Sequence, residues 1–267
     1  MARRAAFPPA KTDPRTDGHP PARDWPGPAG GLASVRRWPL LDLVRGVAIV
    51  AMIAYHFCFD LAVFGWLAAD FGAWRWVAFR TPILGTFLFV AGVSLGLAEV
   101  RGQSPSRFWR RVAVVAGAAA LVSLGSYLMF PRSYIYFGVL HGIAVMSVLA
   151  RPVVRFGGWL VVAGVIVVVA GSAIQHPFFD LPALRWIGMM TFKPLTEDYV
   201  PLFPWFGLML SGVGVGVLAA RRCPQRIADL KVPRPLAWVA WLGRHSLTVY
   251  LVHQPLLLVI LAVARRI

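Results

Sequence analysis

Seven long apolar runs fill the chain from about residue 40 to its end, and they constrain its fold more than any other feature. A helix that crosses the hydrocarbon core of a bilayer needs about 20 mostly apolar residues, because each residue adds about 1.5 Å. The runs are close to that length and cover residues 43–66, 82–100, 112–130, 134–150, 157–174, 202–220 and 238–263. The sequence therefore predicts an all-α, polytopic membrane helix bundle with about seven transmembrane helices.

The composition excludes a water-soluble globule. Apolar residues make up 58% of the chain and charged residues 14%, whereas soluble domains average about 45–50% and 25%. The net charge of +16 could suggest nucleic-acid binding, but the basic residues lie mostly in the N-terminal tail and short loops. Membrane topology explains that distribution better, so we expect no nucleic-acid partner. The two cysteines, Cys58 and Cys223, form no metal-binding or disulfide pattern.

Residues 1–39 differ from the rest, since they are polar, rich in arginine and carry eight of the 21 prolines. Such a segment buries too little apolar surface to offset the loss of chain entropy on folding. It also contains no apolar stretch long enough for a cleaved signal peptide. We therefore expect residues 1–39 to form a disordered cytoplasmic tail and residues 40–267 to form the membrane domain.

The basic residues also predict the orientation in the membrane. With the tail in the cytoplasm, the inner segments carry 18 Lys and Arg residues and the outer segments carry seven. This excess is typical of cytoplasmic segments. The long connection over residues 175–201 then lies outside, and its many aromatic residues favour a cap in the membrane interface.

Two pairs of glycines have the spacing that allows helix backbones to approach closely. They are Gly92 with Gly96 and Gly212 with Gly216. We interpret both pairs as helix-packing sites without a chemical role. No internal repeat of the kind found in inverted-topology transporters is visible along the runs, which disfavours transport.

Ionisable side chains inside the runs are few, and each costs about 2.5–3.5 kcal/mol at the centre of a membrane helix. Arg45 and His56 lie about 16 Å apart along one helix, yet on the same face of it. Asp60 follows His56 by one helical turn. His141 in the fourth run and His253 in the seventh are predicted at a depth similar to that of His56. Three histidines at one depth favour a functional site.

Each of these residues also has a purely structural interpretation. A neutral buried histidine can simply bridge two helices. Asp60 can lie at a wet outer helix end rather than orient His56. Arg45 can extend to the inner lipid headgroups, with Asp42 as its neutralising partner.

Several motifs resemble a known family. The Arg45-x10-His56 spacing resembles the first span of acyltransferase-3 proteins. Residues 136–141, 198–205 and 242–255 resemble bacterial proteins related to the catalytic domain of heparan-alpha-glucosaminide N-acetyltransferase, once described as a domain of unknown function. The resemblance runs from about residue 40 to 260, and it implies that residues 40–267 form a transmembrane acyltransferase-like domain. It does not carry over the acceptor sugar.

With this resemblance, we expect a multi-pass acyltransferase of the bacterial inner membrane. It would move an acyl group, most simply acetyl, from cytoplasmic acyl-CoA to an amine or hydroxyl of an envelope saccharide or similar acceptor. Acyl-CoA is then a co-substrate, and we expect neither a permanently bound cofactor nor a metal. The oligomeric state is not predicted.

The hypothesis assigns a role to each polar residue. A neutral imidazole accepts a proton near pH 7, so His56 is the candidate base or transient acyl carrier, oriented by Asp60. His141 and His253 would hold the acceptor, polarise the carbonyl oxygen or relay a proton. Guanidinium groups pair well with the phosphates of acyl-CoA. The expected contacts are Arg45, Arg110, Arg111, Arg221 and Arg222.

Three other classes of protein fit the same residues. A proton-coupled carrier could use the histidines and Asp60 as a relay. Two histidines on facing helices could ligate haem in an electron-transfer protein. A structural scaffold is the third alternative, and the polar residues at one depth argue against it.

Overall fold

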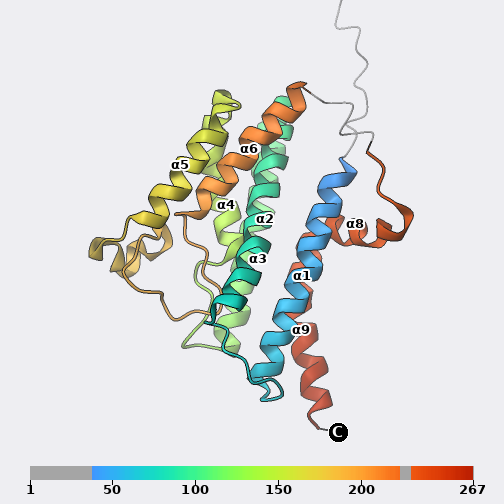
Figure 1. Cartoon of the computed structure of the whole chain (residues 1–267), viewed down its shortest axis with the longest axis vertical. Helices are drawn as coiled ribbons and strands as arrows, with labels where there is room; N and C mark the ends of the chain where they lie inside the picture. Colours follow the sequence, from blue (N-terminus) through green and yellow to red (C-terminus); the bar gives the residue numbers. More distant parts are fainter. Residues whose placement is uncertain (1–37, 223–229, 267) are drawn as a thin grey trace, which may run out of the picture. The chain divides into compact units, whose positions relative to one another are not determined.

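A computed structural model describes residues 38–222 and 230–266 of the chain as a bundle of helices (Figure 1). The longer helices are α1 (Pro39–Val63), α2 (Trp74–Val100), α3 (Pro105–Met129), α4 (Val139–Ala150), α5 (Trp159–Ala173), α6 (Trp205–Arg222), α8 (Ala237–Arg244) and α9 (Ser246–Ala264). Four short 3-10 helices join them: η1 (Arg151–Phe156), η2 (Pro177–Asp180), η3 (Pro182–Ile187) and η4 (Arg234–Leu236).

Five helices of the described residues are long and apolar enough to cross a membrane. They are α1, α2, α3, α4 continued through η1 to Phe156, and α9. The shorter α5 and the arginine-ended α6 run beside them (Figure 1). The predicted all-α polytopic membrane bundle is confirmed, with five candidate spans among the described residues where about seven were predicted. The protein is a multi-pass membrane protein whose apolar faces require a lipid bilayer.

The chain runs back and forth through the bundle. The start of α1, the turn between α2 and α3, and η1 lie at one end, and the end of α9 lies at the other (Figure 1). This alternation agrees with the predicted order of inner and outer connections. The prediction of a disordered tail falls on residues 1–37, outside the described residues. Trp38, which the same prediction included, is buried, and α1 begins at Pro39.

Four predicted runs have clearly different boundaries in the structure. The third helix begins at Pro105, ahead of the predicted residue 112. The second helix begins at Trp74 and contains Pro82 in its interior. The fourth begins only at Val139, because Phe137 pairs instead with the outer connection, where its carbonyl accepts from the Val200 N–H at 3.0 Å. The seventh run is broken at His245, which has non-helical backbone angles, into α8 and α9.

The predicted glycine packing sites join α2 to α6. A Cβ at Gly92 would lie 2.1 Å from the Met209 carbonyl oxygen, and a Cβ at Gly212 would lie 2.1 Å from the Phe89 carbonyl oxygen. A Cβ at the second glycine of either pair would lie 2.4 Å from a carbonyl oxygen of the opposite helix. Any side chain at these positions would collide with backbone, so the prediction of packing sites is confirmed.

A second close crossing joins α1 to α8. A Cβ at Gly46 would lie 1.9 Å from the Val239 carbonyl oxygen, and a Cβ at Gly243 would lie 1.7 Å from the Asp42 carbonyl oxygen. This crossing lies directly before the break at His245.

Candidate functional site

His56 of α1 and His253 of α9 lie side by side in the bundle. Their ring centroids are 5.1 Å apart, with the planes inclined at 59°. The Tyr250 ring, one turn earlier on α9, lies 5.7 Å from that of His253. His253 is buried, with 8% of its surface exposed. Two of the three histidines predicted at one depth therefore meet.

Asp60 joins the same two helices next to this pair. Its side chain is buried, with 1% of the residue exposed, and Oδ1 accepts a hydrogen bond of 2.7 Å from Nε2 of Gln254. This bond links α1 to α9. Among the described residues, the Asp60 carboxylate makes no hydrogen bond to His56. Sequence analysis did not anticipate Gln254 as the partner, although it directly follows His253.

Three buried polar atoms around the pair have no hydrogen-bond partner within the described part of the chain. They are Oδ2 of Asp60, Oε1 of Gln254 and Nε2 of His253. Leaving one buried polar atom unpaired costs about 1–3 kcal/mol. All three atoms lie at the contact between α1 and α9.

His141 lies in a separate network at the start of α4. Its Nδ1 accepts from the Gly138 N–H at 3.3 Å, and its Nε2 lies 3.2 Å from the Ser123 hydroxyl of α3. That hydroxyl donates to the Ile135 carbonyl at 2.6 Å. Both ring nitrogens thus have protein partners, as in the structural interpretation of a histidine that bridges two helices. The predicted role of His141 in acyl transfer stays a prediction.

Asp198 is a further, partly buried polar group that sequence analysis left without a role. It comes from the outer connection, where its Oδ2 accepts from the Val139 N–H at the start of α4 at 2.9 Å. The Tyr250 side chain of α9 is close enough to this carboxyl group to interact with it electrostatically. Burial raises the pKa of Asp198, and the hydrogen bond from Val139 opposes this rise. Both residues stand in the stretches that resemble the family, which was the available signal.

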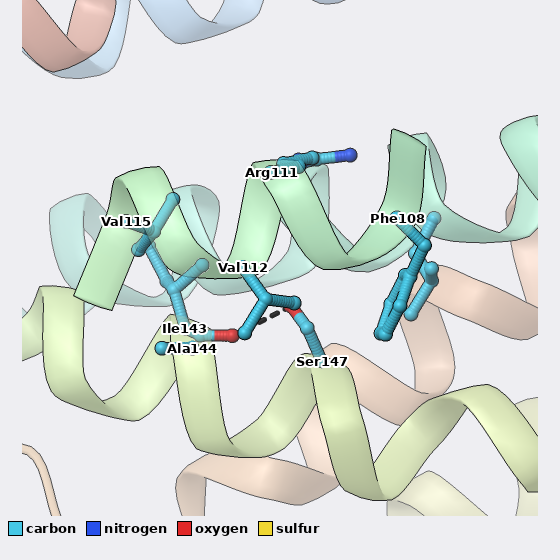
Figure 2. Close-up of a pocket in the computed structure, with 8 residues that line it drawn as sticks. Phe108, Arg111, Val112, Val115, Ile143, Ala144 and Ser147 are labelled. Atoms are coloured by element: carbon cyan, nitrogen blue, oxygen red, sulfur yellow. Dashed lines mark hydrogen bonds between the residues drawn. The ribbon is translucent and has the colours of Figure 1, made fainter. Parts of the chain in front are cut away.

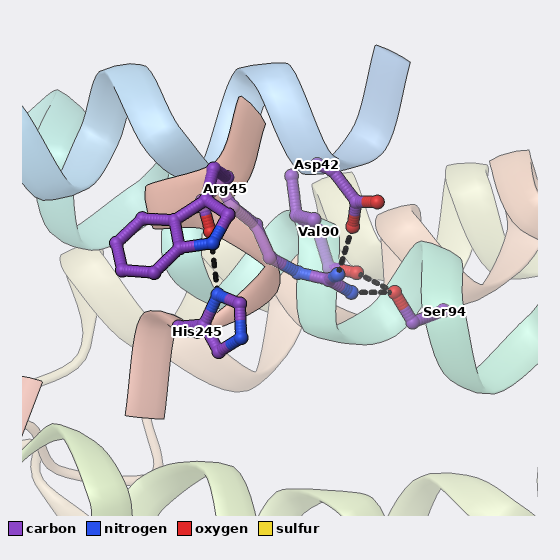
Figure 3. A network of polar contacts seen from close by, with 6 residues as sticks. Asp42, Arg45, Val90, Ser94 and His245 are labelled. Carbon is purple, nitrogen blue, oxygen red and sulfur yellow. Dashed lines mark hydrogen bonds and ion pairs between the residues drawn. The ribbon is translucent and has the colours of Figure 1, made fainter. Parts of the chain in front are cut away.

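Arg45 lies nearer the opposite end of α1, where the predicted cytoplasmic side begins. Figure 3 shows its side chain extending from α1 toward α2, where it donates to the Ser94 hydroxyl. It also forms an ion pair of 3.4 Å with Asp42. The positive charge of Arg111, on α3, is close enough to interact unfavourably with that of Arg45.

The other predicted arginines are not part of this group. Arg110 is exposed on α3, and Arg221 and Arg222 are exposed at the end of α6. Their predicted contacts with acyl-CoA stay predictions.

A small pocket lies between α2, α3 and α4, with Arg111 and Ser147 in its lining (Figure 2). Its volume is about 10 Å³, which is room for about one water molecule. The pocket is therefore too small for an acyl chain.

The described residues include no group of three or more His, Cys, Asp or Glu side chains that could hold a metal ion. Ring centroids 5.1 Å apart also do not suit a haem between His56 and His253. Each ring nitrogen would have to lie about 2 Å from the iron on opposite faces of the porphyrin, which sets the rings farther apart. The geometry disfavours the haem alternative.

The described residues thus form a polytopic membrane bundle with a cluster of polar side chains between α1 and α9. Residues 37–255 match the family described as heparan-alpha-glucosaminide N-acetyltransferase, catalytic. This match covers most of the chain, so the chain belongs to that family, and the resemblance seen in its motifs is confirmed. Family membership implies a membrane protein with transferase activity of the acetyltransferase type. No curated protein and no solved structure matches the chain.

Proposed function

We propose that this protein is an acyltransferase of the bacterial inner membrane. It transfers an acyl group, most simply acetyl, from cytoplasmic acyl-CoA to an amine or hydroxyl of an envelope saccharide or similar acceptor. The observation that carries the proposal is the His56–His253 pair with its three unpaired buried polar atoms. In a family of membrane acetyltransferases, such a pair supplies what acyl transfer needs inside a bilayer.

The chemistry requires a base at the reacting carbonyl. The acceptor oxygen or nitrogen forms a bond to the thioester carbon, the carbon–sulfur bond breaks, and the acceptor proton must be removed. A neutral imidazole performs this step near pH 7, and His56 and His253 are both within reach of one substrate. His56 serves as base or as transient acyl carrier, while Asp60 and Gln254 offer hydrogen-bonding groups to the acceptor.

Acyl-CoA approaches from the end of the bundle that holds Arg45. Arg45 and Arg111 bind its phosphates, and the exposed arginines Arg110, Arg221 and Arg222 neutralise the remaining charge. Arg45 lies about 16 Å from His56 along the helix axis. A long flexible arm such as the pantetheine of CoA is needed to span that distance, which favours this donor over acetyl phosphate.

The test is transfer of labelled acetyl from acetyl-CoA to glucosamine, which carries both an amine and hydroxyls, by the full chain in proteoliposomes. We expect transfer by the wild type and at least 100-fold less by His56→Ala. His176→Ala is the matched control, because His176 is exposed in the outer connection, and it should keep full activity. Size-exclusion elution in detergent shows whether each variant folds.

Two results would contradict the proposal. Full activity of folded His56→Ala would remove the histidine mechanism. Flux of glucosamine into the vesicles without covalent change would instead support the proton-coupled carrier.

A further inference from the structure

The helix α8 is a separate element that the last membrane crossing does not need. The sequence predicts one continuous span over residues 238–263, but α9 alone is long and apolar enough to cross. Its 19 residues reach about 28 Å, close to the hydrocarbon thickness of about 30 Å. The eight residues of α8 reach only about 12 Å. In Figure 1, α8 runs across the direction of α1 and α9, in the half of the bundle where α1 begins.

One face of α8 is buried against α1, and the opposite face is exposed. The buried face consists of Val239, Ala240 and Gly243, which include the residues of the close crossing with α1. On the other face, Trp238 and Trp241 have 58% and 51% of their surface exposed. A short amphipathic helix with exposed tryptophans is typical of the membrane–water interface, where indole rings lie at the level of the headgroups.

The exposed residues around these tryptophans carry positive charge and no negative charge. Lys231 and Arg234 precede α8 and Arg244 ends it, and all three are exposed. Residues 230–245 contain no Asp or Glu. Among the described residues, no carboxylate forms an ion pair with these three side chains. The segment therefore offers cations without anions of its own, and such a surface attracts anionic lipid headgroups.

The junction between α8 and α9 holds one of the two tryptophans in place. The ring centroid of His245 lies 4.5 Å from that of Trp241, with the planes inclined at 39°. Nδ1 of His245 lies 2.9 Å from the Trp241 carbonyl oxygen. A side chain that is already held in one position loses less conformational entropy when a ligand binds. Gly243, Arg244 and His245 stand in a stretch that resembles the family, yet the proposed function gives them no role.

We propose that residues 230–245 form a binding site for an anionic phospholipid, in the leaflet on the predicted cytoplasmic side. Arg234 and Arg244 bind the charged headgroup, while Trp238 and Trp241 lie where the headgroups meet the acyl chains. This site is separate from the polar α1–α9 contact and does not depend on the proposed function. The general excess of positive charge in cytoplasmic segments is the simpler explanation for the arginines, so the experiment has to separate a site from that excess.

The test is quenching of tryptophan fluorescence by phosphatidylglycerol with brominated acyl chains, added to the full chain in non-ionic detergent. Brominated phosphatidylcholine, which has no net charge, reports the quenching that any lipid produces at exposed tryptophans. We expect half-maximal quenching at a phosphatidylglycerol concentration at least tenfold lower than that of phosphatidylcholine. Trp238→Phe combined with Trp241→Phe keeps aromatic rings on α8 and should abolish this difference, because the indoles that report the site are gone.

Arg234→Gln combined with Arg244→Gln removes two charges from the site. Each basic residue near an anionic surface strengthens binding about fivefold, so the half-saturating concentration of phosphatidylglycerol should rise at least tenfold. The matched control is Arg107→Gln combined with Arg155→Gln, which removes two exposed charges at the start of α3 and in η1. It should stay within about twofold of the wild type. Size-exclusion elution in detergent shows whether each variant folds.

Four outcomes would overturn the proposal. Equal half-saturation by the two lipids in the wild type would show no preference for negative charge. Equal rises in both charge variants would show a diffuse basic surface, and selective quenching that persists in the folded double tryptophan variant would place the site elsewhere. Quenching of Trp238 and Trp241 by neither lipid would show that protein, such as a second copy of the chain, covers α8. Acyl transfer is not measured here, so none of these outcomes bears on the proposed function.

Discussion

Two helix contacts of the same bundle are built in opposite ways. Between α2 and α6, glycines bring the backbones so close that a single Cβ at Gly212 would lie 2.1 Å from a carbonyl oxygen. Between α1 and α9, the facing residues include His56, Asp60, His253 and Gln254, three of which hold buried polar atoms without a partner in the described residues. At the glycines of the α2–α6 contact there is no room for a side chain. At the α1–α9 contact, buried polar atoms remain available for hydrogen bonds.

This difference indicates that one helix contact stabilises the bundle while another carries its polar groups. Lipid does not drive helices together as water does, so close packing of small residues has to hold the bundle. The α2–α6 contact provides this packing and lets the α1–α9 contact keep polar groups that weaken association. Changes to the first contact should therefore affect stability, and changes to the second should affect activity more than stability.

The largest expected effect is on the glycine contact. Gly212→Ala places a methyl group against the Phe89 carbonyl, and the backbones must separate. We expect a loss of about 3 kcal/mol or more in unfolding free energy, at the upper end of overpacking effects. Thermal unfolding of purified protein in detergent measures it.

Gly117→Ala is the matched control, because a Cβ at Gly117 in α3 meets nothing within 4 Å. It should be neutral or stabilising by up to about 1 kcal/mol, since alanine favours helix. Equal melting temperatures for both variants would show that the α2–α6 contact does not hold the bundle.

The second prediction concerns the Asp60–Gln254 bond. Asp60→Leu leaves the buried Gln254 amide unpaired and should cost about 1–3 kcal/mol of stability. Adding Gln254→Met replaces both polar partners by apolar groups of similar shape, so most of that stability should return. Acetyl transfer should stay impaired in the double variant, because both groups offered to the acceptor are gone.

Denaturation and transfer assays on the two single variants and the double variant complete the cycle. If activity returned together with stability, the polar groups of the α1–α9 contact would have only a structural role.

The third prediction tests the end of α1 that lies away from the histidines. Arg45→Lys keeps the charge but loses the planar fork, so it no longer holds Ser94 and a phosphate together. We expect KM for acetyl-CoA to rise about tenfold, equivalent to about 1.4 kcal/mol, with kcat little changed. Arg107→Lys, exposed in the first turn of α3, should leave both constants unchanged, and an equal rise in KM there would argue for a diffuse basic surface.

Local sequence patterns predicted the helices of this bundle, but they did not predict which residues far apart in sequence are hydrogen-bonded. The apolar runs and the paired glycines follow from composition and spacing within one helix. The glycine contacts were located correctly, whereas several runs have shifted ends and the seventh is broken into α8 and α9. Pro82 inside α2 and the break at His245 depend on packing against other helices, which local propensity does not contain. Asp60 accepts from Gln254, and Asp198 accepts from the Val139 N–H. These partners are far away in sequence, so the spacing rules that matched Arg45 with His56 could not find them.

The smallest expected effect concerns an ion pair that lies outside the α1–α9 contact. Glu99 of α2 and Arg151 of η1 form an ion pair of 3.1 Å, with roughly a fifth of each side chain exposed. Arg151 also stacks on Phe108, its guanidinium carbon 4.3 Å from the ring centroid, so Glu99→Gln removes one charge and leaves that packing. Because exposed pairs contribute about 0–1 kcal/mol, we expect a loss of about 0.5 kcal/mol in low salt, a smaller loss at high ionic strength, and unchanged acetyl transfer. If Glu99→Gln lowered acetyl transfer as much as His56→Ala, activity would depend on the rigidity of the whole bundle and not on the polar α1–α9 contact.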